Sequence, residues 1–217
     1  MADFIRARSS EQKLHRLEEI KAAARALFDE RPYHEITLTT IAEKLDWSRA
    51  NLYKYASTKE EIFLDIASDE RTRYMTALLE AFPEHHGRTP AEAAETWADV
   101  AAANKAWFRY GDILFAIIEV NVSVERLAAF KGGYYEELAR LEERLGPVLG
   151  IEPARVSSLM DAVHYHAVGL VGSCQNNPLI QQALDSIGIR LAKPDFRSEM
   201  RDFIGMCLEH YRRGLNA

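Results

Sequence analysis

The residues best equipped for chemistry lie close together, between positions 37 and 59. Hydroxyl, amide, cationic and aromatic side chains gather there, at Thr37, Thr39, Ser48, Arg49, Ala50, Asn51, Tyr53, Lys54, Tyr55 and Lys59. An arginine can donate two hydrogen bonds to guanine, and an asparagine can pair with adenine in the same two-bonded manner. Lysine, tyrosine and threonine side chains suit phosphate oxygens. This mixture of residue types predicts contact with duplex DNA.

Within this stretch, a few positions suit base contacts and the others suit phosphate contacts. Arg49 and Asn51 are the base-reading candidates, and the small Ala50 between them lets a helix approach the base edges closely. The phosphate candidates are Thr37, Thr39, Tyr53, Lys54, Tyr55 and Lys59. The alternative is a packing module of three helices whose polar face is merely solvated. Exposed tyrosines on a short basic helix have little structural purpose, which favours the DNA interpretation.

Two short helices must position these side chains. Apolar spacing predicts one helix from about Leu38 to Leu45 and another from Arg49 to Tyr55, with Ser48 as the N-cap of the second. Joined by a short turn and braced by the preceding helix, they form a helix-turn-helix unit. The inward positions are Ile41, Ala42, Leu45 and Leu52. The opposite face of the second helix carries Arg49, Ala50, Tyr53 and Lys54.

Helical periodicity also dominates the remainder of the chain, and no alternating strand pattern is present. Further helices are expected over about residues 11–30, 58–81, 90–103, 105–121, 124–149, 153–176 and 194–213, with a short one ending near 186. Ser57 and Glu60 have the spacing of a capping box for the helix that begins at residue 58. The sequence therefore predicts an all-α protein. It comprises an N-terminal helix-turn-helix domain (1–57) and a long helix leading into a larger C-terminal helical bundle (58–217).

Composition limits the class of protein. The net charge is −6, but residues 1–60 carry a balance of +1 and the remainder −7, which permits a nucleic-acid partner for the N-terminal part. No apolar run reaches the roughly 18 residues of a membrane span. Cys174 and Cys207 lack the spacing of a metal site and are expected to be reduced and buried. We expect a soluble, cytoplasmic protein.

The block "LFDERPYHEITLTTIAEKLDWSRANLYKYASTKEEIF" resembles the DNA-binding domain of the TetR family of bacterial transcriptional regulators. The positions that match the family pattern are Tyr33, Thr37, Ile41, Ala42, Ser48, Leu52, Tyr53, Tyr55 and Lys59. Pro32 and Asp46 stand where the family commonly has glycine, and Ala56 where it often has phenylalanine. Asp tolerates a left-handed backbone better than most residues, so the turn at Asp46 is expected to survive.

The resemblance implies a homodimer that binds a near-palindromic operator, most often as a repressor. It also implies that a small molecule in the C-terminal bundle moves the two DNA-binding domains out of register with the major grooves. The last two long helices of each subunit are expected to form the dimer interface. A row of small residues broken by one histidine, comprising Ala162, His166, Gly169 and Ser173, fits such an interface.

Aromatic residues in the bundle, with few charges among them, suit an apolar or aromatic effector held by a few polar groups. The ligand-binding candidates are Trp107, Phe115, Asn121, Tyr134 and His164. The alternative for each is ordinary core packing, and His164 on an apolar face also reads as a core histidine. His164 and His166 lack the i, i+4 spacing of helical metal sites, and His85-His86 reads as a solvated pair.

No phosphate-binding loop, HExxH motif or nucleophile elbow is present, which argues against an enzyme and predicts no cofactor. Three functions remain as hypotheses. The first is a repressor released from DNA by a small molecule. The second is an activator or architectural DNA-binding protein without a small ligand, and the third is a helical enzyme or interaction bundle with a vestigial N-terminal module.

Overall fold

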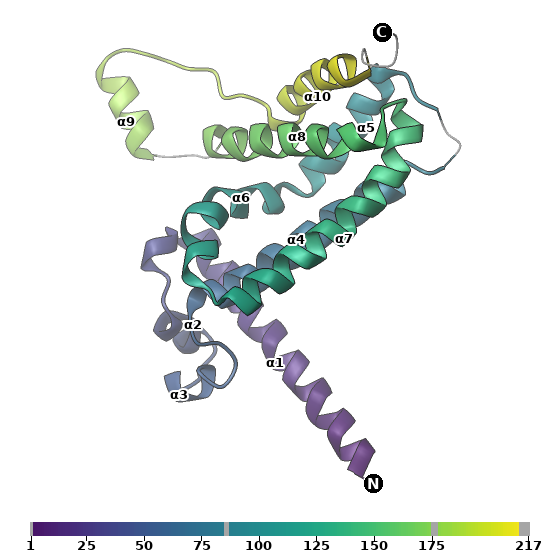
Figure 1. Cartoon of the computed structure of the whole chain (residues 1–217). Helices are drawn as coiled ribbons and strands as arrows, with labels where there is room; N and C mark the ends of the chain where they lie inside the picture. Colours follow the sequence, from purple (N-terminus) through teal and green to yellow (C-terminus); the bar gives the residue numbers. More distant parts are fainter. Residues whose placement is uncertain (1, 85–86, 175–177, 213–217) are drawn as a thin grey trace. The chain divides into compact units, whose positions relative to one another are not determined.

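The computed structural model describes residues 2–84, 87–174 and 178–212 (Figure 1). The described residues form helices and no strands, which confirms the all-α prediction. The α-helices are α1 (Ala2–Glu30), α2 (Leu38–Lys44), α3 (Arg49–Leu52), α4 (Lys59–Ala81), α5 (Pro90–Ala103), α6 (Lys105–Ile113), α7 (Val124–Leu149), α8 (Pro153–Cys174), α9 (Pro178–Ser186) and α10 (Phe196–Arg212). Two short 3-10 helices, η1 (Tyr33–Glu35) and η3 (Glu119–Asn121), and one π-helical segment, η2 (Leu114–Ile118), complete the set. The expected His85-His86 pair lies outside the described residues.

The chain divides into two compact units. The first comprises residues 1–69 and 114–130, and the second comprises residues 70–113 and 131–217. The first unit contains all of the predicted domain 1–57, together with the start of α4 and the segment that leads into α7. Arg126, near the start of α7, donates to the Asp65 carboxylate of α4 at 2.9 Å and so joins these two parts of the first unit.

Apolar side chains from α1, η1 and α4 form the core of the first unit. The rings of Phe28, Tyr33 and Phe63 meet edge to face, with the Phe63 centroid 5.6 Å from Phe28 and 5.0 Å from Tyr33. Ile41 of α2 and Leu52 of α3 are fully buried, as their spacing predicted. Each such side chain contributes about 1.5–3 kcal/mol by leaving water. These contacts fix α2 and α3 against α1.

Local caps set the ends of α2 and α3. Thr37 and Thr40 form a reciprocal capping box, in which the Thr37 hydroxyl accepts from the Thr40 amide at 3.1 Å. The Ser48 hydroxyl accepts from the Asn51 amide at 3.2 Å, which confirms Ser48 as the N-cap of α3. Asp46 adopts a left-handed backbone with φ of 54°, so aspartate does take the role of glycine in this turn.

Several predicted helix boundaries were wrong, beginning with α1, which starts at Ala2 and not near Glu11. α3 gives way to a turn after Leu52 instead of continuing to Tyr55, and the helix expected over residues 105–121 leaves the α form after Ile113. The cap of α4 is Thr58 and not Ser57, since the Thr58 hydroxyl accepts from the Glu61 amide at 3.2 Å. Glu60 does not complete the predicted capping box, because its carboxylate accepts a 3.0 Å hydrogen bond from the Tyr33 hydroxyl instead.

In the second unit, α10 packs against α5 and α8, and α6 packs against α8 (Figure 1). The α5 helix begins with a capping box between Thr89 and Glu92, and Pro90 is its first helical residue. Trp97 of α5 is fully buried, and its indole N–H donates to the hydroxyl of Tyr74 at 2.7 Å. Cys174 is half-buried and Cys207 is buried, both as free thiols. Among the described helices, none combines the length and apolar character required to cross a lipid bilayer.

Candidate nucleic-acid interface

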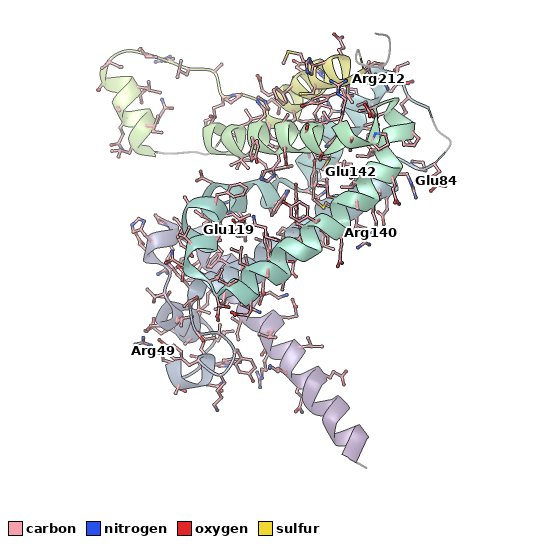
Figure 2. All side chains as sticks on the ribbon, viewed as in Figure 1. Arg49, Glu84, Glu119, Arg140, Glu142 and Arg212 are labelled. Atoms are coloured by element: carbon pink, nitrogen blue, oxygen red, sulfur yellow. The ribbon has the colours of Figure 1, made fainter. Side chains whose placement is uncertain are left out.

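The short helix α3 presents its polar side chains to solvent. The Leu52 side chain is fully buried, and its burial determines which side of α3 faces solvent. The exposed residues of α3 and the turn after it are Arg49, Ala50, Tyr53 and Lys54. They are the positions that helical geometry assigned to the outward face (Figure 2, which labels Arg49).

Arg49 and Tyr53 form a pair on this exposed surface. The Arg49 Nη2 group donates to the Tyr53 hydroxyl at 2.7 Å, and the guanidinium carbon lies 5.2 Å from the centre of the tyrosine ring. A guanidinium has five N–H donors in a rigid planar fork, and the Tyr53 hydroxyl accepts from one of them. The pair therefore holds a cation outward, with fewer conformations than a free arginine would sample.

A shallow hollow of about 270 Å³ lies beside this pair. Its lining residues come from the turn before α2, from α2, from α3 and its following turn, and from the start of α4: His34, Ile36, Thr37, Leu38, Thr39, Arg49, Tyr53, Thr58, Lys59 and Glu60. We refer to it as the α2–α3 hollow. It unites five of the ten predicted DNA-binding residues with the N-terminal turn of α2, whose backbone N–H groups attract anions.

Lys59 has a structural contact that the sequence did not reveal. Its ammonium donates to the backbone oxygen of Tyr33 at 2.8 Å and lies 4.0 Å from the centre of the Tyr33 ring. Burial lowers the pKa of Lys59. An ammonium has three N–H groups, and this bond uses one of them. Lys59 is therefore part of the hollow and part of the packing of the unit.

Among the remaining predicted residues, Ser48 is exposed but already hydrogen-bonded, and Asn51 and Tyr55 are half-buried. Tyr55 is half-buried and lies 5.8 Å, ring to ring, from Trp47, above which the Arg16 guanidinium lies at 5.1 Å. Sequence reasoning missed Trp47 and Arg16 because they meet only through the packing of α1 beside the turn before α3.

Two family models match consecutive parts of the chain. A model described as "Bacterial regulatory proteins, tetR family" matches residues 20–66, and one described as "Tetracyclin repressor-like, C-terminal domain" matches residues 68–212. The chain belongs to the TetR family. It is thus a DNA-binding transcriptional regulator, and α2 and α3 are the helix-turn-helix of its N-terminal domain.

Solved structures show the same TetR-family fold. A tetR-family regulatory protein from Rhodococcus RHA1 is 16% identical, with a TM-score of 0.59 over 90% of this chain and 96% of its own. The fatty acid degradation regulator FadR from Bacillus halodurans is 14% identical, with a TM-score of 0.56 over 90% and 96%. A putative TetR-family regulator from Mesorhizobium loti is 16% identical, with a TM-score of 0.51 over 93% and 97%. Among curated proteins, no sequence matches the chain.

In this TetR-family chain, the predicted ligand-binding residues divide between the two units. Trp107 and His164 come together in the second unit, with ring centres 5.1 Å apart. Tyr134, in the same unit, is half-buried and donates to the Asp161 carboxylate at 3.3 Å. Phe115 and Asn121 belong to the first unit and are exposed, and the Asn121 amide donates to the Ile117 carbonyl at 2.7 Å.

The Trp107–His164 contact depends on a glycine. A Cβ atom at Gly111 would lie 2.5 Å from Cγ2 of Val168 and 3.5 Å from the His164 ring, so only glycine lets α6 approach α8 this closely. Burial lowers the pKa of His164 to about 4, which keeps the imidazole neutral at physiological pH. Within the described ranges, no group of three or more His, Cys, Asp or Glu side chains could hold a metal ion.

The predicted small-residue row of α8 lies partly at the surface. Gly169 and Ser173 are exposed, and the His166 ring stacks on Phe203 of α10 with centres 3.8 Å apart and planes 5° from parallel. Met206, also on α10, is 62% exposed. The exposed positions of α8 and α10 thus include both small and apolar residues.

Proposed function

We propose that this TetR-family regulator is a repressor that a small-molecule effector releases from its operator. The observation that supports DNA recognition most strongly is the exposed Arg49–Tyr53 pair beside the α2–α3 hollow, because it holds a cation outward at a helix anchored only by Leu52. In this proposal Arg49 contacts a guanine, and Asn51 an adenine. The phosphate contacts would come from Thr37, Thr39, Tyr53, Lys54, Tyr55 and Lys59.

The active form in this proposal is a homodimer on a near-palindromic operator in the cytoplasm. The second subunit would cover the outward face of α8 and α10, where the histidine stack and the exposed glycine of the small-residue row lie. Two-fold symmetry of the protein matches two half-sites separated by about one helical turn of DNA. Light scattering after size exclusion at low micromolar concentration should give twice the monomer mass, and a monomer alone would rule the dimer out.

The effector in this proposal is apolar or aromatic. The buried Trp107–His164 pair supplies flat apolar surface, and the hydroxyl of Tyr134 supplies a polar contact. A neutral His164 can accept or donate a hydrogen bond without the cost of a buried charge.

Selection from a pool of random duplexes tests DNA binding and yields the operator sequence at the same time. Duplexes that the purified protein selects should share a near-palindromic sequence, and that sequence should occur beside the gene of the protein. Tyr53→Ala should abolish binding at physiological salt, because it removes a phosphate contact and the support of Arg49. Tyr135→Ala is the matched control, since this tyrosine is 64% exposed in the second unit and should leave the DNA affinity unchanged.

Effector release is tested on the same duplex. Small apolar and aromatic compounds added to the protein–DNA complex should include some that release the DNA, and Trp107→Ala should abolish the response without weakening DNA binding. A complex that no compound dissociates, on a promoter that the protein activates, would support an activator or architectural role instead.

A further inference from the structure

A second hollow lies on the other side of α3, within the first unit. Its volume is about 710 Å³, and it is lined by the N-terminal half of α1 and by the turn that follows α3: Gln12, Lys13, His15, Arg16, Glu19, Lys54 and Tyr55. We refer to it as the α1–α3 hollow. It shares no lining residue with the α2–α3 hollow, so the two are separate surfaces of the first unit.

The lining of the α1–α3 hollow favours an anion. It contains three permanent cations, Lys13, Arg16 and Lys54, against one carboxylate, Glu19. That carboxylate is already engaged, since its Oε2 accepts from Arg16 at 2.7 Å and its Oε1 lies 3.7 Å from Nδ1 of His15. The side chains of His15 and Arg16 are 73% and 49% exposed, so a ligand in solvent can reach them.

Aromatic packing ties this cationic surface to the turns that flank α3. The Arg16 guanidinium lies over Trp47, whose ring lies 5.8 Å from that of Tyr55. Trp47 immediately precedes the cap of α3, and Tyr55 follows the helix after the exposed Lys54. The Arg16 guanidinium therefore lies beside the turns that flank α3.

The participating part of α1 has little role in the core of the unit. From Glu11 to Glu19 every residue is exposed or half-buried, Leu14 is 64% exposed, and burial begins only at Ile20. The family model for the DNA-binding domain also begins at residue 20. Figure 1 shows this N-terminal half of α1 continuing past α2 and α3. It is an addition to the matched domain, and its cations contribute little to the packing of the described core.

We propose that the α1–α3 hollow binds phosphates of the DNA backbone that flank each operator half-site. The inference rests on the proposed DNA recognition by α3 and extends the contacted DNA beyond the bases that α3 reads. Lys54 lines the hollow and follows the recognition helix directly, so a backbone that passes α3 continues towards Lys13 and Arg16. Phosphate oxygens match the ammonium and guanidinium donors there.

The test compares two duplexes of the selected operator sequence. One ends at the last selected base pair, and the other extends by about one helical turn of unrelated sequence on each side. Wild-type protein should bind the longer duplex more tightly and with a steeper dependence on salt. In the double variant Lys13→Gln/Arg16→Gln, the salt slope on the longer duplex should fall by about 1.8 per subunit, at about 0.9 for each lost phosphate contact.

The double variant should bind the short duplex as the wild type does, because the residues on α2 and α3 are unchanged. Arg140→Gln, a change of an exposed cation in the second unit, should behave as wild type on both duplexes. Helix content by circular dichroism shows whether the double variant is folded. Equal behaviour of wild type and double variant on the longer duplex overturns the inference, as does an equal loss on both duplexes. A wild-type protein that selects no DNA at all overturns the proposed recognition itself.

Discussion

Arg49 in the first unit and Arg71 in the second each hold a hydrogen-bond partner, yet their surroundings are opposite. Arg49 is exposed and bonds to a tyrosine hydroxyl. The Arg71 side chain is 3% exposed, and its Nε donates to the Glu137 carboxylate at 2.8 Å. An exposed arginine can exchange one partner for another at little cost, whereas a buried guanidinium requires its counter-ion at all times.

Tyr53 of the first unit and Tyr74 of the second show the same contrast. Tyr53 is 44% exposed, whereas Tyr74 is 2% exposed and accepts the indole N–H of Trp97. These polar groups of the first unit are thus available to an external partner, while those of the second satisfy one another. Changes in the first unit should therefore alter DNA binding more than stability, and changes in the second should do the reverse.

The largest expected effect is on the stability of the second unit. Glu137→Ala removes a carboxylate that accepts from the buried Arg71 and should lower the free energy of unfolding by about 4 kcal/mol, because the buried guanidinium loses this counter-charge. Urea denaturation followed by tryptophan fluorescence measures this loss. Glu143→Ala, a substitution at a partly exposed carboxylate on the same helix, should change it by less than about 0.5 kcal/mol. If the two variants lost similar free energies of unfolding, the burial of the Arg71–Glu137 pair would not explain the effect of Glu137→Ala.

A smaller loss of folding stability is expected when the pH is lowered. His164 has a pKa of about 4 in the folded chain, below the ordinary value of 6.5 that it regains on unfolding, so the unfolded chain binds the extra proton first. Stability from this group is intact above pH 6.5 and is lost as the pH falls towards 4, by about 2 kcal/mol at pH 5. The difference in urea stability between pH 7 and pH 5 should shrink by that amount in His164→Gln. An unchanged difference would mean that His164 is not the group that titrates.

A specific effect on DNA is expected in the first unit. Arg49→Ala should cost about 1.5 kcal/mol of discrimination at one base position in each half-site and leave the free energy of unfolding unchanged. Competition between operator duplexes with single base changes measures this discrimination. If all duplexes weakened equally, Arg49 would be a phosphate contact instead of a base contact.

The smallest effects are expected at Lys59, which both lines the α2–α3 hollow and packs within the first unit. Lys59→Gln should lower the salt slope of DNA binding by about one unit and also reduce stability by about 1 kcal/mol, because the ammonium donates to the Tyr33 carbonyl as well. Salt titrations of affinity and urea denaturation supply the two values. A loss of stability with an unchanged salt slope would assign Lys59 to packing alone.

Helical periodicity accounts for the part of the interface that could be predicted. The division of α3 into a buried Leu52 and an exposed face follows from a period of about 3.6 residues, and the caps at Thr37 and Ser48 follow from neighbouring backbone amides. The cap of α4 could not be predicted, because Tyr33 takes the Glu60 carboxylate across 27 positions.

In the bundle, periodicity carries less information about function. An aromatic residue such as Trp107 follows the same spacing whether it packs a core or lines a cavity, and its neighbour His164 comes from a distant helix. The contact is decided by Gly111, whose missing Cβ matters only once α6 and α8 are packed together. The contact between Arg16 and Trp47 likewise depends on packing between residues that are far apart in the sequence.

The N-terminal half of α1 has a consequence for the kinetics of amide hydrogen exchange. The segment from Glu11 to Glu19 lies within the 29-residue helix α1, buries little surface and is stabilised mainly by its own backbone hydrogen bonds and by local pairs such as Arg16 with Glu19. Most helical stability in proteins comes from tertiary packing, which this segment largely lacks. Its amides should therefore exchange within the fastest class of the free protein, while those after Ile20 exchange slowly. If DNA occupies the α1–α3 hollow, the exchange of the amides from Glu11 to Glu19 should slow. The conformational entropy lost as this segment becomes ordered then reduces the net free energy of DNA binding.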